Sequence, residues 1–91
     1  IILGMEVFES FEGDDIRETG IMTMPQDFEE MLGGHSVLAV GYIDGPNPTK
    51  SKKGCLIVRN SWGMEWGDKG YFYMPYEYIK DHTFDYWIMN K

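Results

Sequence analysis

Two stretches decide the expected fold, GGHSVLAVGY at residues 33–42 and VRNSWGMEWGDKGYF at residues 58–72. From His35 to Ile43 two sets of apolar or small side chains alternate along the chain, which is typical of a strand buried on both faces. The Gly, Pro and Lys content of Asp44–Gly54 indicates a loop, and Cys55–Arg59 is again an apolar run. These features predict two antiparallel strands joined by a polar loop.

The remaining sequence predicts more strand than helix. Further strands are expected at 1–8, 70–74 and 84–89, with a short extended piece at 20–24. Helical turns are expected at 25–32, between Pro25 and a Gly pair, and at 75–81, while the acidic residues 12–15 are expected to form a turn. The sum is an α+β fold that is mostly β, an antiparallel sheet or partial barrel with little helix.

Length, charge and cysteine content bound the function. We expect residues 1–91 to form one domain, because a chain of this length builds only one modest core. Fifteen acidic residues against eight basic ones argue against a nucleic-acid partner. The sequence contains neither a membrane-length apolar run nor a signal peptide, so we expect a soluble chain without a membrane partner.

The single cysteine, Cys55, excludes an intrachain disulfide, and the localisation stays unknown. Because the chain begins with Ile1 inside a strand pattern, we expect it to be a fragment.

The hairpin brings one histidine and one asparagine together. If it closes at Asn47-Pro48 without a bulge, His35 lies directly opposite Asn60, with their Cβ atoms about 5 Å apart. The Asn oxygen accepts a hydrogen bond from one imidazole N–H, which fixes the tautomer and leaves the other nitrogen free to exchange a proton with a nucleophile. The pair therefore forms the orienting half of a catalytic triad.

Two nucleophilic side chains near this pair are excluded by strand geometry. Ser36 follows His35 on a strand and points to the opposite face. Cys55 is five residues along the strand from Asn60, roughly 16 Å. We expect Cys55 to pack in the core as a small hydrophobic residue.

Structural interpretations of the same residues stay open. A histidine or asparagine at a strand end is often exposed or turn-forming, and Trp62 and Trp66 are also compatible with core packing beside turn glycines. His82 is expected to be a solvated turn residue. The spacing of His and Cys does not suit zinc, and a phosphate-binding loop is missing, so we expect no cofactor and no metal.

The two stretches resemble a known enzyme family. GGHSVLAVGY is similar to the segment around the catalytic histidine of papain-like cysteine proteases, the family of papain and the cathepsins. NSWGMEWGDKGYF is similar to the segment around the catalytic asparagine, with NSWG, a second WG and GY in the same order. The resemblance is specific over Gly33–Phe72 and implies that residues 1–91 correspond to the C-terminal β domain of the papain-like fold.

The resemblance also implies roles for individual residues. His35 would be the catalytic base, Asn60 its orienter, and Trp62 the indole that shields their hydrogen bond from water. Residues that flank the cleft would help to line the substrate groove, namely Gly33, Gly34 and Ser36. Gly34 stands where many members have Asp, and Ser36 stands where a small residue such as Ala is common.

In this family the nucleophilic cysteine and the oxyanion-binding glutamine belong to an N-terminal helical domain. The implied activity is peptide-bond hydrolysis by a Cys/His/Asn mechanism, and this chain alone is expected to be inactive. The implied partners are a peptide or protein substrate, and either the missing helical domain or another copy of the chain. Two alternatives remain: a non-catalytic homologue that serves as a peptide-binding or structural module, and a self-associating fragment.

Overall fold

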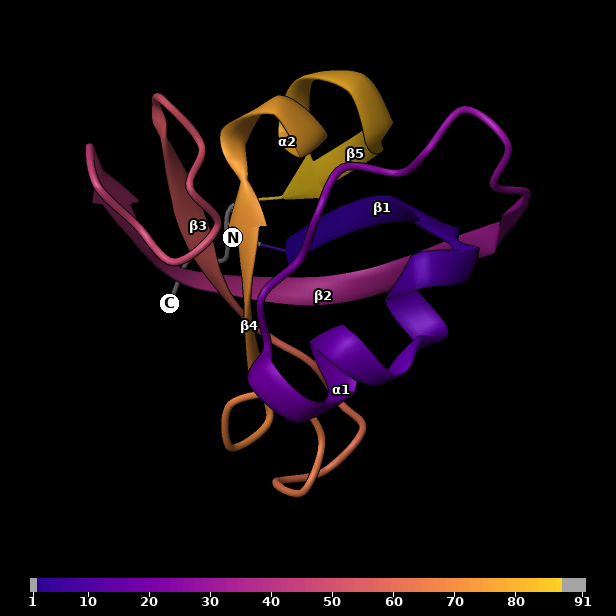
Figure 1. The fold of residues 1–91 in the computed structure, drawn as a ribbon, viewed down its shortest axis with the longest axis horizontal. Coiled ribbons are helices and arrows are strands. Elements are labelled where there is room, and N and C mark those ends of the chain that lie inside the picture. Colours follow the sequence, from indigo (N-terminus) through magenta and orange to yellow (C-terminus); the bar gives the residue numbers. More distant parts are fainter. Residues whose placement is uncertain (1, 88–91) are drawn as a thin grey trace.

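A five-stranded antiparallel sheet with the order β4-β3-β2-β1-β5 forms the centre of the computed structural model, which describes residues 2–87 (Figure 1). Along the chain the elements are β1 (Ile2–Phe8), the 3-10 helix η1 (Glu9–Glu12), α1 (Asp14–Thr19), β2 (Met31–Asp44), β3 (Gly54–Arg59), β4 (Tyr71–Pro75), α2 (Tyr76–His82) and β5 (Thr83–Trp87). The predicted mostly β, antiparallel fold is confirmed. Neither helix within these residues is long and apolar enough to cross a bilayer.

The central strand β2 is longer than the sequence indicated. It begins at Met31, four residues before the expected start, and runs for 14 residues. Figure 1 shows it as a long ribbon that runs beside β1 at one end and beside β3 at the other. The early start occurs because Gly33 and Gly34, interpreted as helix-ending residues, pair with Val7 and Glu6 of β1. Glycine therefore extends this strand instead of separating it from a helix.

The helix predicted at 25–32 does not form beyond a single turn, in which the N–H of Glu29 bonds to the carbonyl of Gln26 at 3.0 Å. The backbone N–H groups on either side of this turn are bonded by carboxylates. Glu29 accepts hydrogen bonds from the N–H of Gln26 and of Ser10, each at 2.8 Å, and Glu9 accepts one from the N–H of Glu30 at 2.9 Å. Side-chain acceptors compete with helix formation in this way when acidic residues are clustered.

The segment 12–15, predicted as a turn, contains the end of η1, Gly13 and the first two residues of α1. This helix buries Ile16 and ends at Gly20, whose N–H bonds to the carbonyl of Ile16 at 2.8 Å. Gly20 has φ of 75°, and a Cβ there would lie 2.8 Å from the nitrogen of Asp68 and from the carbonyl oxygen of Tyr71. Only glycine fits this close approach between the end of α1 and the loop before β4.

The other predicted elements lie close to their expected positions. The loop at 44–54, the strand at 70–74 and the helical turn at 75–81 match the observed elements within about one residue. The extended piece at 20–24 makes an isolated bridge between Ile21 and Tyr73. Within the predicted strand at 84–89 the structure describes β5 as far as Trp87, and the rest, like Ile1, lies outside the described residues.

One face of the sheet carries the core. Alternate residues of β1 point into it, and aromatic side chains from η1, β4 and the loop before β4 complete it. The buried hydrophobic residues of this cluster are Leu3, Met5, Val7, Phe11, Ile16, Met22, Val37, Val58, Trp66, Phe72, Met74 and Tyr78.

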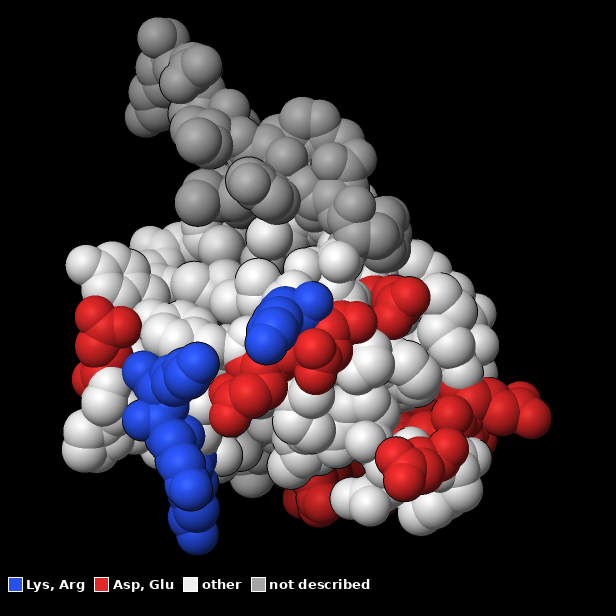
Figure 2. All heavy atoms as spheres, turned by 90° about the horizontal axis from the view of Figure 1, so that it is seen from above, with Lys and Arg blue, Asp and Glu red and all other residues white. Residues whose placement is uncertain are grey.

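The net charge of −7 resides in one short part of the chain. Residues 9–30 contain eight of the fifteen acidic residues and one basic residue, Arg17, whereas the rest of the chain carries seven of each sign. Figure 2 shows acidic side chains at the right-hand end, on the side where Figure 1 shows η1 and the start of β2, and others in the centre and at the left edge. Lysine and arginine lie toward the left and centre of that view.

Candidate active site

His35 lies on β2 beyond the end of β3. It pairs with Met5 of β1, while the first pair between β2 and β3 is Leu38 with Arg59. The backbone of His35 is therefore paired on one side only, with β1. On its other side, His35 faces the chain that continues from the end of β3. The imidazole is half-buried.

Asn60 is the first residue after β3. Its backbone N–H bonds to the carbonyl of Gly70 at 2.9 Å, which closes the loop between β3 and β4, and the residue is only 5% exposed. The Oδ1 atom accepts hydrogen bonds from Nε2 of His35 at 2.9 Å and from the N–H of Ser61 at 2.8 Å. Because Oδ1 can only accept, the Nε2 atom of His35 carries the proton, and Nδ1 of the neutral ring has the free lone pair. The hydrogen bond expected between His35 and Asn60 is confirmed.

The strand register expected to produce this contact is wrong. Leu38 pairs with Arg59, and the register shifts between Ala39 and Gly41, so the bulge-free hairpin predicted from the sequence does not occur. Continuing the first pair would set Asn60 beside Val37 instead of His35. The contact forms because Asn60 follows the last paired residue, where the chain turns toward the His35 side.

Trp62 lies beside the imidazole. The centroids of the Trp62 and His35 rings are 5.3 Å apart with an interplanar angle of 33°, and Trp62 remains 43% exposed. Its indole also contacts Trp66 edge-on at 5.2 Å. Trp66 is buried in the core, whereas Trp62 lies at the surface beside His35, so the two tryptophans of the motif have different environments.

Phe11 of η1 is a site residue that sequence reasoning missed. It is 2% exposed, and its ring centroid lies between 5.1 and 5.4 Å from those of Trp62, Trp66 and Phe72. The His35 ring is 6.3 Å away. In the sequence, Phe11 is an aromatic residue within an acidic segment. This pattern does not indicate which distant residues its ring contacts.

The loop that carries Trp62 and Trp66 depends on glycine. Gly67 has φ of 67°, and a Cβ there would lie 2.5 Å from the carbonyl oxygen of Tyr71. Its N–H donates to the carbonyl of Arg17 at 2.6 Å, which ties the loop to α1. The Gly-rich spacing of the motif therefore reflects close backbone approaches that position the aromatic rings.

The expected cleft residues lie around His35 on β2. Gly34 and Ser36 are exposed, and Gly33 is half-buried. A Cβ added to Gly33 would meet no atom within 4 Å, so the space beside its backbone is open. Whether these residues contact a substrate stays a prediction.

Cys55 is far from the imidazole. It pairs with Ile43, eight residues along β2 from His35, a separation of roughly 26 Å. The thiol is fully buried, and burial raises its pKa. The expectation that Cys55 packs in the core is confirmed, and a raised pKa opposes formation of the reactive thiolate.

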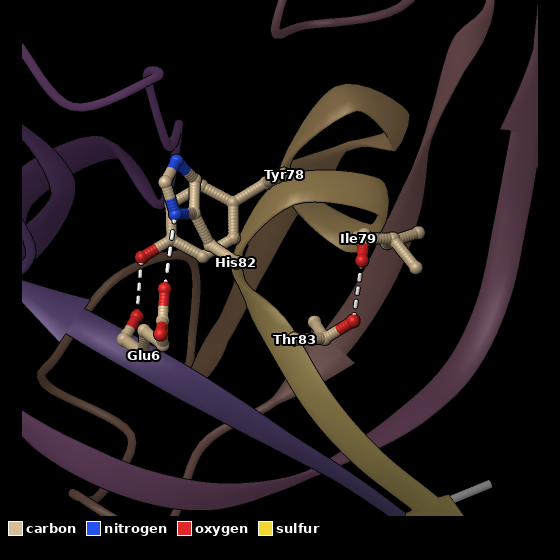
Figure 3. A network of polar contacts seen from close by, with 5 residues as sticks. All are labelled: Glu6, Tyr78, Ile79, His82 and Thr83. Carbon is tan, nitrogen blue, oxygen red and sulfur yellow. Dashed lines mark hydrogen bonds and ion pairs between the residues drawn. The ribbon is translucent and has the colours of Figure 1, made fainter.

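The prediction that His82 is a solvated turn residue is wrong. His82 is the last residue of α2, and its Nδ1 atom lies 3.1 Å from Oε1 of Glu6 on β1 (Figure 3). Its ring packs against Phe8 and Tyr78, with centroids 4.9 and 5.0 Å apart, and the Tyr78 hydroxyl donates to the backbone carbonyl of Glu6. The second histidine therefore links α2 to β1. Among the side chains that the structure describes, which end at Thr83, no group of three or more His, Cys, Asp or Glu is arranged to hold a metal ion.

Comparison with known proteins gives a consistent result. The sequence model of the papain family cysteine proteases matches residues 7–85. An uncharacterized peptidase C1-like protein, L477 of Acanthamoeba polyphaga mimivirus, is 43% identical over 93 aligned residues, which cover 100% of this chain and 28% of that protein. The thiol protease aleurain of Arabidopsis thaliana is 35% identical over 81% of this chain and 19% of its own length.

A solved structure supports the same relationship. Xylellain, a cysteine protease from Xylella fastidiosa, superposes with a TM-score of 0.74 at 33% identity, covering 92% of this chain and 29% of that one. The chain thus spans less than a third of the length of each of these relatives. With a family match over most of its sequence and a sheet that corresponds to the β domain of the papain-like fold, the chain belongs to the papain family of cysteine proteases.

Proposed function

We propose that this chain supplies the histidine and asparagine of a papain-like cysteine peptidase, with His35 as the base and Asn60 as its orienter. The single observation that carries the proposal is the 2.9 Å hydrogen bond from Nε2 of His35 to the buried Oδ1 of Asn60. This bond leaves Nδ1 of the same ring to exchange a proton with a thiol.

The proposed reaction needs a cysteine from outside residues 1–91. Cys55 is buried and lies far along the sheet from His35, so it is not the nucleophile. His35 takes the proton of the external thiol at Nδ1, and the thiolate attacks the peptide carbonyl. The imidazolium then gives this proton to the leaving amine, and in the second half of the reaction Nδ1 accepts a proton from the water that hydrolyses the acyl-enzyme. A glutamine and a backbone N–H of the cysteine-bearing part would stabilise the oxyanion, as the family resemblance implies.

The aromatic residues support the orientation of the pair. Trp62 covers one side of the imidazole, and Phe11 supports Trp62 from the core. Limiting water around a hydrogen bond strengthens it, because the local dielectric constant falls. We further propose that a peptide substrate passes along Gly33, Gly34 and Ser36, where the open space beside Gly33 leaves room for its backbone.

The test uses the natural polypeptide that contains this chain and a thiol-directed epoxide that traps cysteine proteases. Peptide mapping should find one labelled cysteine outside residues 1–91, with Cys55 unlabelled. His35→Gln should slow labelling by about 10²-fold or more, whereas the matched variant of the other histidine, His82→Gln, should leave the rate nearly unchanged. Labelling at Cys55, or equal rates in the two variants, would refute the proposal. A polypeptide with no reactive cysteine would indicate a non-catalytic homologue.

A further inference from the structure

The loop between β2 and β3, residues 45–53, is the basic loop of the chain. It contains three of the eight basic residues, Lys50, Lys52 and Lys53, and no acidic residue. All three lysines are exposed. Figure 1 shows this loop at the left-hand end of the molecule, and Figure 2 shows lysine and arginine side chains on the same side. In a chain with a net charge of −7, the basic loop is therefore a local positive surface.

Two of the three lysines have no acidic partner. Glu77 of α2 accepts a hydrogen bond from the hydroxyl of Ser51 at 2.5 Å. The pKa of Glu77 lies below its ordinary value, first because Ser51 donates to it and also because the charge of Lys53 is near. Lys50 and Lys52, in contrast, form no ion pair with the side chains that the structure describes. Their charges are available to an anionic partner from outside.

Hydrogen bonds centred on Asn47 organise the basic loop. The Nδ2 atom of Asn47 donates to the carbonyls of Gly45 at 2.8 Å and of Ser51 at 2.9 Å, and Oδ1 accepts from the N–H of Thr49 at 3.0 Å. The bond from Ser51 to Glu77 ties the same loop to α2. A surface that is already ordered loses little conformational entropy when a partner docks on it.

Lys50 has a backbone conformation that lysine does not favour. Its φ is 60°, and its N–H bonds to the carbonyl of Asn47 at 3.1 Å, which closes the turn. Glycine and asparagine adopt a positive φ more readily than lysine does. A surface residue that is kept in an unfavourable conformation points to a role for its side chain. The side chain of Lys50 offers a positive charge on a flexible stem, which suits an anionic partner.

We propose that the basic loop is an exosite, a surface outside the active site, that binds an acidic stretch of a polypeptide substrate. This inference rests on the proposed function, which makes a peptide chain the natural partner of the protein. Carboxylates of the substrate pair with Lys50 and Lys52, and the attraction raises the rate of encounter. Tyr42, which precedes the loop on β2 and is 68% exposed, adds an aromatic surface for a neighbouring apolar side chain.

The length of β2 determines how far the acidic stretch lies from the bond that is cleaved. His35 is nine residues before the end of β2 at Asp44, which corresponds to roughly 30 Å. Because an extended peptide spans at most about 3.6 Å per residue, a substrate needs at least about eight residues between the two points. An acidic stretch that is closer to the cleaved bond cannot reach the loop while the bond lies at His35.

Binding is tested first, without using activity, on the natural polypeptide that contains this chain. The probe is a fluorescein-labelled oligoglutamate peptide, measured by fluorescence anisotropy at low and at high salt. We expect it to bind at low salt and to be released at high salt. Lys50→Gln should weaken binding several-fold. Lys50→Arg, which keeps the charge, should preserve it, as should the matched variant Lys80→Gln, which changes an exposed lysine of α2.

Lys50→Asn separates binding from stability. Asparagine suits a φ of 60° better than lysine does, so this variant should resist urea slightly better than the wild type. It should nevertheless bind the oligoglutamate as weakly as Lys50→Gln. A purely structural role of Lys50 predicts the first effect without the second, which would contradict the inference.

The distance is tested with a peptide that the protein cleaves, joined to an oligoglutamate tail through a Gly/Ser linker of about four or about twenty residues. Only the long linker lets the tail reach the basic loop. It should lower KM several-fold, with kcat unchanged, relative to the same peptide with an oligoglutamine tail. The short linker should have no such effect, and equal effects of the two linkers would overturn the inference.

Three further results would overturn it: no salt-sensitive binding of the oligoglutamate, binding that Lys50→Gln leaves unchanged, and tighter binding of a DNA oligomer of the same charge, which would assign the loop to polyanions in general. Failure of the inference is distinguishable from failure of the proposed function, because anisotropy does not require cleavage. If labelling by the epoxide depends on His35 but the oligoglutamate does not bind, this inference fails alone. If the oligoglutamate binds through Lys50 but labelling does not depend on His35, the proposed function fails, and the loop binds acidic peptides without serving as a substrate exosite.

Discussion

The Nε2 atom of His35 lies 2.9 Å from Oδ1 of Asn60, although strand pairing does not set the two residues opposite one another. β3 ends before it reaches the level of His35, and the chain that continues from it carries the asparagine across. The contact therefore depends on the loop after β3 as much as on the sheet, and Ser61 supports it by donating its backbone N–H to the same oxygen.

The function of the proposed base should depend on an oxygen atom at position 60 that accepts its hydrogen bond. Whether this oxygen belongs to an amide or to a carboxylate should matter less. Asn60→Ala removes the acceptor and should slow epoxide labelling of the external cysteine by about tenfold, the value of one hydrogen bond of typical strength. Asn60→Asp keeps an oxygen for His35 and Ser61, so it should retain more of the rate. Equal rates in the two variants would argue that Asn60 does not act through this hydrogen bond.

Phe11 should contribute strongly to stability. Phe11→Ala leaves a cavity among Trp62, Trp66 and Phe72 and should reduce the free energy of unfolding by about 3–5 kcal/mol. The tryptophan fluorescence of the folded protein should also change, since two indoles lose a neighbour. Phe28→Ala is the matched control, because Phe28 is 82% exposed, and its effect should stay within about 0.5 kcal/mol. Similar losses in the two variants, measured by urea unfolding, would contradict the role of Phe11.

Cys55 should make stability fall at alkaline pH. Burial raises the pKa of its thiol in the folded protein above the unfolded value. The folded state therefore keeps its proton where the unfolded state loses it, and stability is fully present below the ordinary thiol pKa and declines as the pH rises above it. Urea unfolding between pH 7 and 10 should show this decline in the wild type and a flatter profile in Cys55→Ala. Parallel profiles would mean that Cys55 is not the group responsible.

The Glu29 carboxylate should stabilise the loop before β2, and this contribution to the free energy of unfolding should depend on pH. Partial burial alone would raise the pKa of this carboxyl, but the backbone N–H groups of Gln26 and Ser10 outweigh it, and the pKa lies below its usual value. The stabilisation is therefore present at neutral pH and is lost as the pH falls through the lowered pKa. Glu29→Gln should cost about 1 kcal/mol at pH 7, as for loss of a helix cap, and the difference should shrink toward pH 3.

The control for Glu29 is its neighbour. Glu30 uses only its backbone N–H, which donates to Glu9, and its side chain makes no hydrogen bond to the residues that the structure describes. Glu30→Gln should therefore change the free energy of unfolding by less than about 0.5 kcal/mol at either pH. A difference between wild type and Glu29→Gln that does not vary with pH would exclude the carboxylate as the cause.

The parts of the fold that could be predicted are those in which local pattern and environment agree. The alternation from His35 to Ile43 and the apolar run from Cys55 to Arg59 correctly indicated two paired strands. The burial of the first strand on both faces, which the same alternation predicted, is wrong, because Val40 and Tyr42 of β2 are 51% and 68% exposed. The bulge near Val40 has no comparable signal, because shifting the register by one residue leaves both sets of side chains apolar or small. The correct contact between His35 and Asn60 was therefore derived from an incorrect register.

The errors in helix prediction have a similar physical origin. Pro25 and the following acidic residues suit a helix start, but Phe28 has no core to pack on, and Glu29 bonds to the backbone instead. In α1 the reverse occurs, because a segment rich in turn-forming residues becomes helical once Ile16 is buried. Tertiary packing decides such short helices, and a single sequence does not reveal the partner surface. The same reason explains why Phe11 was missed as a neighbour of Trp62.

The bridge between Ile21 and Tyr73 has a consequence for unwanted polymerisation. Tyr73 donates its N–H to the carbonyl of Gly20 at 2.7 Å and accepts from the N–H of Met22 at 3.1 Å, on the side of β4 that faces away from β3. These groups would otherwise form an open template at the margin of the sheet, where a strand from another molecule can add. An incoming strand must first displace Gly20–Met22. The short segment after α1 therefore hinders the addition of strands, and so the growth of fibres, at β4.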